Sequence, residues 1–352
     1  MTDLILGIET SCDETAAAVV ESSKLIRSSI VSSQVQLHER FGGVVPEIAS
    51  RAHVDLIVPV VAEALVASGV EGDEIEAVAA TSGPGLVGSL LVGVSAAKAL
   101  AMVWDVPFIA VNHLEAHLYA SFLEDPDLQL PLVFLLVSGG HTLLVLMEEQ
   151  GKYRVLGSTL DDAAGEAFDK VARYLGLGYP GGPAIDNLAL EGDRSAFQYP
   201  RSLVQENPAT LPDDRKFAFS FSGLKTAVVN HVRSNPDVAT EDVVASFQEA
   251  VVDALVTKLK WALESTGVEA ACLGGGVAAN SRLRERFMEV CDSTGVKGCL
   301  PSRAMCTDNA AMIAWAAIEK IKIGAKHNIT FKPTPRWQLD DPKAIRTISE
   351  KK

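Results

Sequence analysis

Residues 4–20 read LILGIETSCDETAAAVV: an apolar run, a polar turn and a second apolar run. Each run is short and continuously apolar, which is typical of a β-strand buried on both faces. The pattern returns about 130 residues later, where LVFLLV at residues 132–137 is followed by the turn SGGHT and by LLVLM at residues 143–147. A repeat of strand, polar or glycine turn and strand predicts a duplicated α/β unit.

Helices and strands alternate outward from these two units. Pro46 begins a predicted helix, because proline suits the first helical position. Thr240 is the expected N-cap of the longest helix, since Glu241 and Asp242 follow it in the first turn. The pattern predicts strands at residues 75–80, 107–111 and 270–273, and helices at 46–65, 86–104, 114–123 and from Ala278 onward.

The domain boundaries follow from this alternation. We expect an N-terminal half at residues 1–125 and a C-terminal half at residues 126–325. The stretch around residues 193–219 is polar and contains three prolines, so it is predicted to be a segment inserted in the second half. Residues 326–352 carry further prolines and mixed charges and are predicted to be a C-terminal tail.

The composition excludes several classes of protein. The 352 residues include 31 Lys and Arg against 45 Asp and Glu, which gives a net charge of −14. A hydrophobic content of 48% excludes an intrinsically disordered chain. The acidic balance argues against a chain that binds nucleic acid by itself, because phosphate contacts need clustered Lys or Arg. Binding through a local basic patch, or together with a basic partner, remains open.

The chain shows no sign of export or of a membrane span. The N-terminus lacks a positively charged region followed by a long apolar run. Residues 77–97 carry no charge, but Ser82, Gly83, Pro84 and Gly85 would break a spanning helix. The five cysteines are odd in number and form no Cys-x-x-Cys pair, so a disulfide framework is not expected. We therefore expect a cytoplasmic protein without a membrane partner.

Residues 113–117 read HLEAH and are the first candidate for chemistry. His113 and His117 are four residues apart on one helix face, a spacing that chelates metals, although a plain surface or core pair explains it as well. Glu115 lies about 200° around the helix from each histidine, so it points away and cannot serve as the base of a zinc protease. Asp308 precedes a predicted helix and, taken alone, would be interpreted as its N-cap.

Two glycine-rich turns are candidates for binding an anion. Residues 138–142, Ser-Gly-Gly-His-Thr, lie between two strands, where backbone N–H groups can approach a phosphate, although a plain glycine hairpin explains them as well. Residues 274–276 are three glycines between a strand and a helix, an arrangement typical of nucleotide sites. Asn280 just beyond them can hydrogen-bond a base or a ribose, but close helix–strand packing also explains the glycines.

Two acidic stretches complete the candidates. Asp161 and Asp162 precede a predicted helix that carries Asp169, and Asp186 follows the Pro-Gly-Gly-Pro loop at residues 180–183 as a possible ribose acceptor. In the first turn, Cys12 lies beside two carboxylates that raise a thiol pKa, which makes it a poor nucleophile. Asp13 and Glu14 are better suited to acid–base chemistry, and the alternative is a solvated turn.

Together these segments resemble the tRNA N6-adenosine threonylcarbamoyltransferase family, formerly labelled O-sialoglycoprotein endopeptidases. The resemblance covers about residues 3–320, without a departure at a motif position. The segments that carry it are GIETSCDET at 7–15, VPEIASR at 45–51, GPG at 83–85, NHLEAH at 112–117, SGGHT at 138–142, DDAAGEAFD at 161–169, FSFSGLK at 219–225 and CTDN at 306–309.

The resemblance implies the fold shared by actin, sugar kinases and Hsp70, with a nucleotide cleft between two similar halves. It implies transfer of a threonylcarbamoyl group from threonylcarbamoyl-adenylate to N6 of adenosine 37, 3′ of the anticodon, in tRNAs that read codons beginning with A. It implies one metal ion per chain on His113, His117 and Asp308; the family's metal is iron, and these ligands equally admit zinc. The implied substrate contacts are Ser138, Gly139, Gly140, His141, Thr142, Asp169, Gly182, Asp186 and Asn280.

The remaining expectations concern proton transfer, partners and alternatives. Asp13 or Glu14 would assist proton loss from the acceptor amine. The resemblance implies a separate adenylate-forming enzyme and, in a bacterium, a paralogous partner of the same fold and a small ATPase. The partner would dock on the helices near residues 46–65 and 86–104. The alternative functions are an ATP-hydrolysing or sugar-phosphorylating enzyme of the same fold, or a scaffold subunit that binds nucleotide without turnover.

Overall fold

The computed structural model describes residues 3–204, 208, 211–325 and 329–341. The chain divides into two compact units. The first takes residues up to 127, residues 150–152 and residues from 308 onward, and the second takes residues 128–149 and 153–307. The expected division differs from this one, because residues 308–325 belong to the same compact unit as the N-terminal elements.

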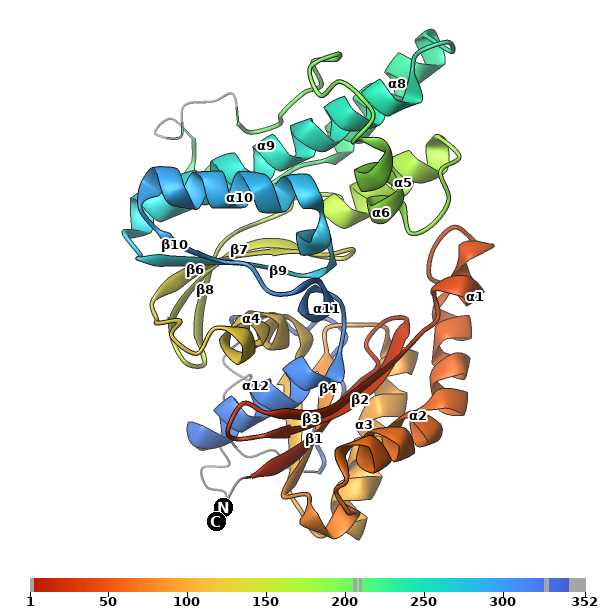
Figure 1. The fold of residues 1–352 in the computed structure, drawn as a ribbon, viewed down its shortest axis with the longest axis vertical. Helices are drawn as coiled ribbons and strands as arrows, with labels where there is room; N and C mark the ends of the chain where they lie inside the picture. The colour runs from red at the N-terminus through yellow and green to blue at the C-terminus, as the bar shows by residue number, and fades with distance from the viewer. Residues whose placement is uncertain (1–2, 205–207, 209–210, 326–328, 342–352) are drawn as a thin grey trace. The chain divides into compact units, whose positions relative to one another are not determined.

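The first unit is built on a five-stranded sheet in the order β3-β2-β1-β4-β5 (Figure 1). β1 pairs antiparallel with β2 and parallel with β4, while β2 pairs antiparallel with β3 and β4 parallel with β5. The sequence at residues 4–20 therefore forms the predicted strand pair. The strands are β1 (Leu4–Glu9), β2 (Glu14–Glu21), β3 (Ile26–Ser33), β4 (Ala77–Gly83) and β5 (Phe108–Asn112).

Helices cover both faces of this sheet. Leu6 and Ile8 of β1 share a hydrophobic core with residues of α2 and α3. Gly7, between them, points to the opposite face, where a Cβ would come within 2.4 Å of Ala310 O in α12. Glycine is thus required where that helix meets the sheet. The helices of the unit are α1 (Val35–Glu39), α2 (Pro46–Ser68), η1 (Gly72–Glu74), α3 (Val87–Val103), α4 (His113–Glu124) and α12 (Ala310–Lys322).

The second unit repeats this topology in a sheet of order β10-β9-β6-β7-β8. In this sheet β6 pairs antiparallel with β7 and parallel with β9, and β9 pairs parallel with β10. In the first unit, β1 pairs in the same way with β2 and β4, and β4 pairs in the same way with β5. The duplication predicted from residues 132–147 is therefore confirmed. The strands are β6 (Leu132–Val137), β7 (Thr142–Glu149), β8 (Lys152–Ser158), β9 (Ala270–Gly274) and β10 (Lys297–Cys299).

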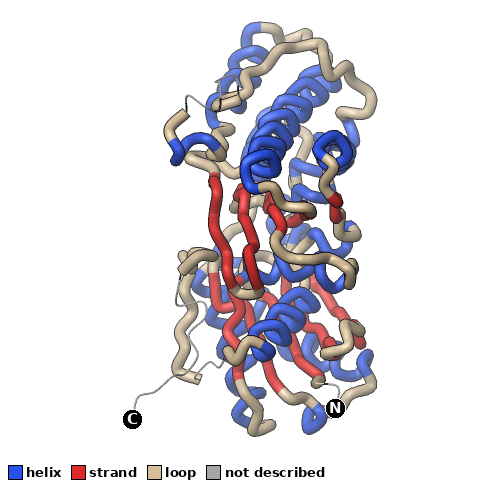
Figure 2. The backbone as a smooth tube through the Cα atoms, turned by 90° about the vertical axis from the view of Figure 1, so that its left-hand side faces the viewer, coloured by secondary structure: helices blue, strands red, loops and turns tan. Residues whose placement is uncertain are grey.

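The core of the second unit lies between this sheet and a layer of helices. Val133, Leu135 and Val137 of β6 pack with α5, α9 and α10 in one hydrophobic cluster. Figure 2, coloured by secondary structure, shows helices flanking the strands in both units. The helices are α5 (Ala164–Tyr174), α6 (Gly181–Leu188), α7 (Asp213–Lys216), α8 (Ser222–Ser234), α9 (Thr240–Thr266), η2 (Gly276–Ala279), α10 (Ser281–Thr294) and α11 (Arg303–Cys306).

Three local predictions need correction. Ala239, not Thr240, is the N-cap of α9, and it makes no side-chain cap. Residues 276–279 form a short 3-10 turn, so α10 begins at Ser281 and not at Ala278. Within the predicted tail, Trp337 is buried and its carbonyl accepts a bond from Asn112 Nδ2 at 3.2 Å, so this part packs on the first unit. Residues 342–352 lie outside the described residues.

Three observations concern the predictions about membrane spans and disulfides. In the part of the chain that the structure describes, no helix combines the length and the apolar character needed to cross a membrane. The charge-free stretch at residues 77–97 forms β4 and most of α3, separated by the predicted turn. All five cysteines are free, as their number and spacing predicted.

Candidate functional site

The two histidines lie where a strand of the first unit passes into a helix. Asn112 ends β5 and caps α4, with Oδ1 accepting the N–H of Leu114 at 2.9 Å and of Glu115 at 3.3 Å. This cap makes His113 the first residue of α4 and places His117 one turn further along the same face. Both imidazoles are buried, so their ring nitrogens need partners inside the protein.

Asp308 approaches both rings from a distant part of the chain. Its Oδ1 lies 3.4 Å from His113 Nε2 and 3.2 Å from His117 Nε2. The helix that follows is capped by the neighbouring residue, because Asn309 Oδ1 accepts the N–H of Met312 at 3.0 Å. The interpretation of Asp308 as an N-cap is therefore wrong. Its carboxylate is directed at the two histidines.

These three residues form a group that can hold a metal ion. One ligand atom from each lies within 4.8 Å of the other two. His117 Nδ1 is buried and has no hydrogen-bond partner among the described residues, which leaves Nε2 as the nitrogen facing Asp308. Two imidazole nitrogens and one carboxylate oxygen suit iron and zinc equally. The residues present therefore fit the metal ion that the resemblance implies, and they suit iron and zinc alike.

Sequence reasoning missed Glu9, which orients the first histidine. Glu9 is fully buried at the end of β1, and its Oε2 lies 2.9 Å from His113 Nδ1. Thr81 Oγ1 donates to the same oxygen at 2.6 Å, and the Ser11 N–H donates to Oε1. A carboxylate on Nδ1 fixes the ring so that Nε2 faces the metal position. A single acidic residue ending an otherwise apolar strand was the available signal.

His113 and the carboxylates beside it shift each other's pKa values. Burial disfavours a charged His113, but Asp308 and Glu9 outweigh it and raise the pKa of His113 well above its usual range. Burial likewise disfavours the Asp308 carboxylate, but His113 and then His117 lower the pKa of Asp308 well below its usual range. The site thus places negative charge opposite two imidazoles, and a cation can replace the proton on His113.

Glu115 lies away from this group, as its position on the helix predicted. Its Oε2 lies 2.9 Å from Lys320 Nζ of α12, and both side chains are only 1% exposed. A buried carboxylate paired with a lysine is held as a structural ion pair. The geometry gives no support to a metalloprotease.

Asp13 ends the turn between β1 and β2, and Glu14 is the first residue of β2. Asp13 is buried, and Glu14 Oε1 accepts a hydrogen bond from Ser33 Oγ at 3.2 Å. Burial, then the negative charges of Asp308 and Asp13, raise the pKa of Glu14 to about 9. Burial and the charge of Asp13 also raise the pKa of the Cys12 thiol, as expected for a poor nucleophile. The turn therefore brings the side chains of Cys12, Asp13 and Glu14 together in a partly buried, acidic environment.

The first glycine turn lies against the N-terminus of α5. A Cβ on Gly139 or Gly140 would have no described heavy atom within 4 Å, so packing does not require glycine there. A Cβ on Gly165 would come within 2.6 Å of Ser138 O. Within the turn, the Ser138 N–H donates to His141 O at 2.7 Å, and Thr142 Oγ1 accepts the Ala164 N–H at 2.9 Å. An open glycine turn beside a helix N-terminus is suited to a phosphate.

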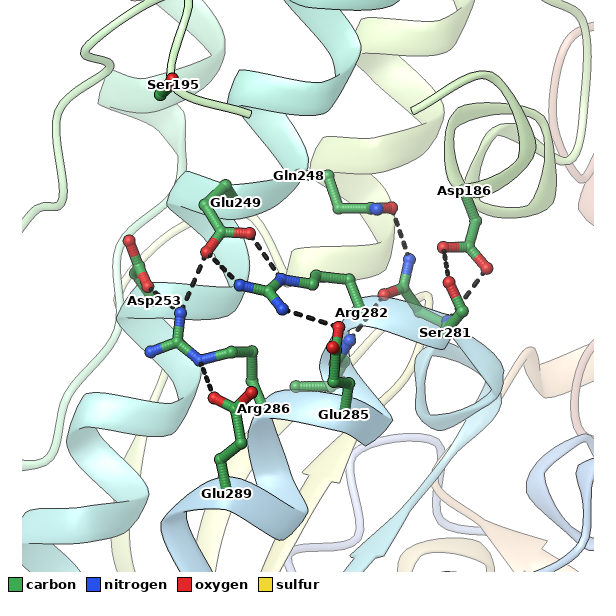
Figure 3. Close-up of polar contacts among 12 residues, drawn as sticks. Asp186, Ser195, Gln248, Glu249, Asp253, Ser281, Arg282, Glu285, Arg286 and Glu289 are labelled. Atoms are coloured by element: carbon green, nitrogen blue, oxygen red, sulfur yellow. Dashed lines mark hydrogen bonds and ion pairs between the residues drawn. The ribbon is translucent and has the colours of Figure 1, made fainter. Parts of the chain in front are cut away.

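The other predicted contacts gather around α5, α6 and the start of α10. Asp169 Oδ1 accepts the Gly181 N–H at 2.8 Å. Asp186 accepts both the N–H and the Oγ–H of Ser281, at 2.9 and 2.8 Å (Figure 3). Asn280 is the N-cap of α10, and its Nδ2 donates to Gln248 at 2.7 Å. These polar atoms already have protein partners, whereas Gly182 has open space around it.

A charged network joins α9 to α10 beside this group, and the sequence did not predict it. Glu249 of α9 binds Arg282 of α10 through two bonds of 2.7 Å and Arg286 through one of 2.9 Å. Asp253 binds Arg286 at 3.0 Å (Figure 3). Bidentate arginine–carboxylate pairs fix geometry as well as charge. They therefore hold the start of α10, and Asn280 with it, against α9.

Comparison with known proteins supports the resemblance. The family model described as tRNA N6-adenosine threonylcarbamoyltransferase matches residues 25–315. A protein of that name from Caldicellulosiruptor saccharolyticus is 52% identical over 96% of this chain and 98% of its own. Another from Clostridioides difficile is 46% identical over 97% of this chain and 100% of its own. The similarity thus extends over nearly the whole of each chain.

Solved structures with low sequence identity agree on the fold. HypF from T. kodakarensis matches 91% of this chain and 48% of its own with a TM-score of 0.62 at 13% identity. Component A of (R)-2-hydroxyglutaryl-CoA dehydratase from Acidaminococcus fermentans matches 91% of this chain and 99% of its own, with a TM-score of 0.53 at 15% identity. The actin-like fold that the resemblance implies, with its duplicated halves, is confirmed.

The alternative of a kinase or ATPase of the same fold, or of a scaffold, is not favoured by these relatives. This chain belongs to the tRNA N6-adenosine threonylcarbamoyltransferase family and is an acyltransferase that modifies tRNA.

Proposed function

We propose that this enzyme transfers the threonylcarbamoyl group from threonylcarbamoyl-adenylate to N6 of adenosine 37 in tRNAs that read codons beginning with A. The observation that carries the proposal is the convergence of His113, His117 and Asp308 in a chain that matches its relatives end to end. The donor is a mixed anhydride, so AMP is a good leaving group and no covalent enzyme intermediate is required.

In this proposal His113, His117 and Asp308 hold one iron or zinc ion. The bound ion would supply positive charge that orients the donor and stabilises charge developing on its oxygens. Glu9 keeps Nε2 of His113 available by engaging Nδ1 of the same ring. The support is the directed geometry of the three side chains and the buried carboxylate behind them.

The donor phosphate is assigned to Ser138, Gly139, Gly140, His141 and Thr142, next to the N-terminus of α5. The nucleoside is assigned to Asp169, Gly182, Asp186 and Asn280. Because Asp186 and Asn280 are bonded to Ser281 and Gln248, they accept a nucleoside only by sharing or exchanging those bonds. Their first effect is then to set the position of α6 relative to α10, and the open backbone at Gly182 receives the ligand.

The acceptor amine has to lose a proton, and we assign the proton to the turn at Asp13 and Glu14. A general base works best when its pKa lies near the working pH. The raised pKa of Glu14 supports this residue as the acceptor, and positive charge bound beside Asp308 would bring that pKa down toward neutrality. Asp13 is then the neighbour whose charge tunes Glu14.

We further propose that the enzyme works with a paralogous subunit of the same fold, a small ATPase and a separate adenylate-forming enzyme. The surface assigned to the paralogue is formed by exposed apolar side chains of α2 and α3. Val58 on α2 is 73% exposed and Met102 on α3 is 69% exposed, although both are large apolar residues. The full surface comprises Val54, Val58, Val66, Val87, Leu91, Met102 and Val103.

The direct test combines purified chain, partners, tRNA, threonine, bicarbonate and ATP, with nucleosides read by mass spectrometry. Formation of threonylcarbamoyladenosine, lost together with bound metal in the variant His113→Ala with His117→Ala, supports the proposal. Full metal content in that double variant contradicts the metal assignment. Hydrolysis of ATP or phosphorylation of a sugar without modified nucleoside would support the alternative enzyme instead.

A further inference from the structure

In the turn that leads into Asp13 and Glu14, three successive backbone carbonyls accept hydrogen bonds from groups outside the turn. Ser11 O accepts the Leu86 N–H at 2.8 Å, and Asp13 O accepts the Gln34 N–H at 2.9 Å. Between them, Cys12 O lies 2.9 Å from His53 Nε2. Two of these carbonyls are bound by backbone groups, whereas that of Cys12 is bound by the side chain of a buried histidine on α2.

The partners of His53 assign the tautomer of its ring. A carbonyl only accepts, so Nε2 carries the proton that it donates to Cys12 O. Nδ1 is then the acceptor, with Thr15 Oγ1 at 2.8 Å and Gln34 Nε2 at 3.3 Å as its donors. Burial lowers the pKa of His53, which agrees with a neutral ring.

The same chain of bonds continues to a second buried histidine. Gln34 Oε1 lies 3.3 Å from His38 Nε2, and His38 Nδ1 accepts the Val45 N–H at 3.3 Å. The bonds therefore run in one direction, from the N–H that precedes α2 through His38, Gln34 and His53 to Cys12 O. Each group donates once toward the turn, and each side chain along the path is buried.

We propose that His53 is a positioning residue for the transfer reaction, which fixes the turn bearing Asp13 and Glu14 through its bond to Cys12 O. The inference rests on the proposed role of that turn in accepting the proton of the amine. His53 touches neither substrate nor metal ligand in this role. It acts through the backbone of Cys12, where a small displacement would move Asp13 and, beyond it, Glu14, the proposed proton acceptor.

The test compares His53→Leu with His53→Gln in the full chain with its partners, preformed threonylcarbamoyl-adenylate and tRNA. The Gln side chain places an N–H near the position of Nε2, whereas Leu fills space without a donor. We expect His53→Leu to lower kcat about tenfold or more with KM for tRNA within about twofold, and His53→Gln to restore most of the rate. Bound metal is expected to stay at the wild-type level in both variants.

Amide hydrogen exchange gives a second measurement that does not depend on catalysis. Exchange in the peptide covering residues 9–16 should be faster in His53→Leu and close to wild type in His53→Gln. The matched control is His231→Leu in the second unit, which also removes a ring bond, to Tyr199 at 2.7 Å, and should change neither kcat nor this exchange.

Unchanged kcat in His53→Leu, equal loss in both variants, or unchanged exchange would overturn the inference. The double variants of His53→Leu with Asp13→Asn or Glu14→Gln separate it from the proposed function. If His53 acts through the turn, its loss adds little to the loss caused by the essential carboxylate. If neither carboxylate variant slows transfer, the proton role fails, and the exchange measurement alone decides whether His53 holds the turn.

Discussion

At the scale of single residues, the candidate metal group depends on the carboxylate of Glu9, which is not one of its three ligands. The spacing of His113 and His117 predicted two ligands on one helix face, and the structure places them so. Glu9 could not be predicted, because its role arises only when β1 and α4 are neighbours in the folded unit. The capping role of Asn309 was likewise invisible, since Asp308 and Asn309 are equally good N-caps.

The first prediction concerns Glu9→Gln. An amide holds His113 Nδ1 less firmly than a carboxylate and removes the negative charge behind the ring, so metal affinity should fall about 10- to 100-fold. Competition with a chelator of known affinity measures the change. Glu63→Gln on the exposed surface of α2 carries the same change of charge and should bind metal as the wild type does. Equal affinity in all three proteins would show that Glu9 has no such role.

The second prediction concerns protons released on metal binding. Because the pKa of His113 is raised, its ring is protonated at neutral pH in the metal-free protein. Binding must displace that proton, so affinity should rise with pH until the pKa is passed. Calorimetric titration of the metal in buffers of different ionisation enthalpy should report at least one proton released per chain. Binding enthalpy independent of the buffer would contradict this account.

At the scale of elements, two runs that the sequence analysis singled out connect helices to one another. Asp161 Oδ1 accepts the N–H of Phe221 at 2.8 Å at the start of α8, and Asp162 binds Lys170 of α5 and Lys225 of α8, each at 2.8 Å. The acidic run and the FSFSGLK run are thus two sides of one contact. The sequence marked both runs but held no information that they meet, because the pairing spans 63 residues.

The third prediction concerns Asp162→Asn. Partial burial raises the pKa of Asp162, but hydrogen bonds from Lys170 and Lys225 outweigh this effect and lower the pKa. A lowered folded pKa stabilises the protein above the unfolded value of about 3.9, and this contribution is lost as pH falls through the folded pKa. The variant should be about 1 kcal/mol less stable at pH 7, since the lysines are partly exposed. Urea unfolding should show that the difference in free energy of unfolding between wild type and variant becomes smaller below about pH 4. A difference that does not change with pH would show that the ion pairs of Asp162 are not its cause.

At the scale of the whole molecule, the sequence predicted the duplicated topology, but it did not predict which later elements complete each unit. Two strand–turn–strand runs were enough to predict two similar halves, because buried strands leave continuous apolar runs. The return of α12 to the first unit was not predicted, since its apolar residues suit any core. That return brings Asp308 to His117 across 191 residues and completes the group of three.

The last prediction is that the chain alone turns over poorly even when threonylcarbamoyl-adenylate and tRNA are supplied. A net charge of −14 repels the phosphate backbone, and tRNA binding depends on cationic contacts and counterion release. The exposed valines and methionine of α2 and α3 form the surface that we assign to the proposed paralogue. We therefore expect multiple turnover only with partners present, and a steep loss of rate with added salt.

Val58→Glu should abolish the stimulation by partners while metal content and thermal stability stay unchanged, because this side chain is 73% exposed. Full turnover by the isolated chain would show that it recruits tRNA unaided, and retained stimulation in Val58→Glu would place the partner on another surface.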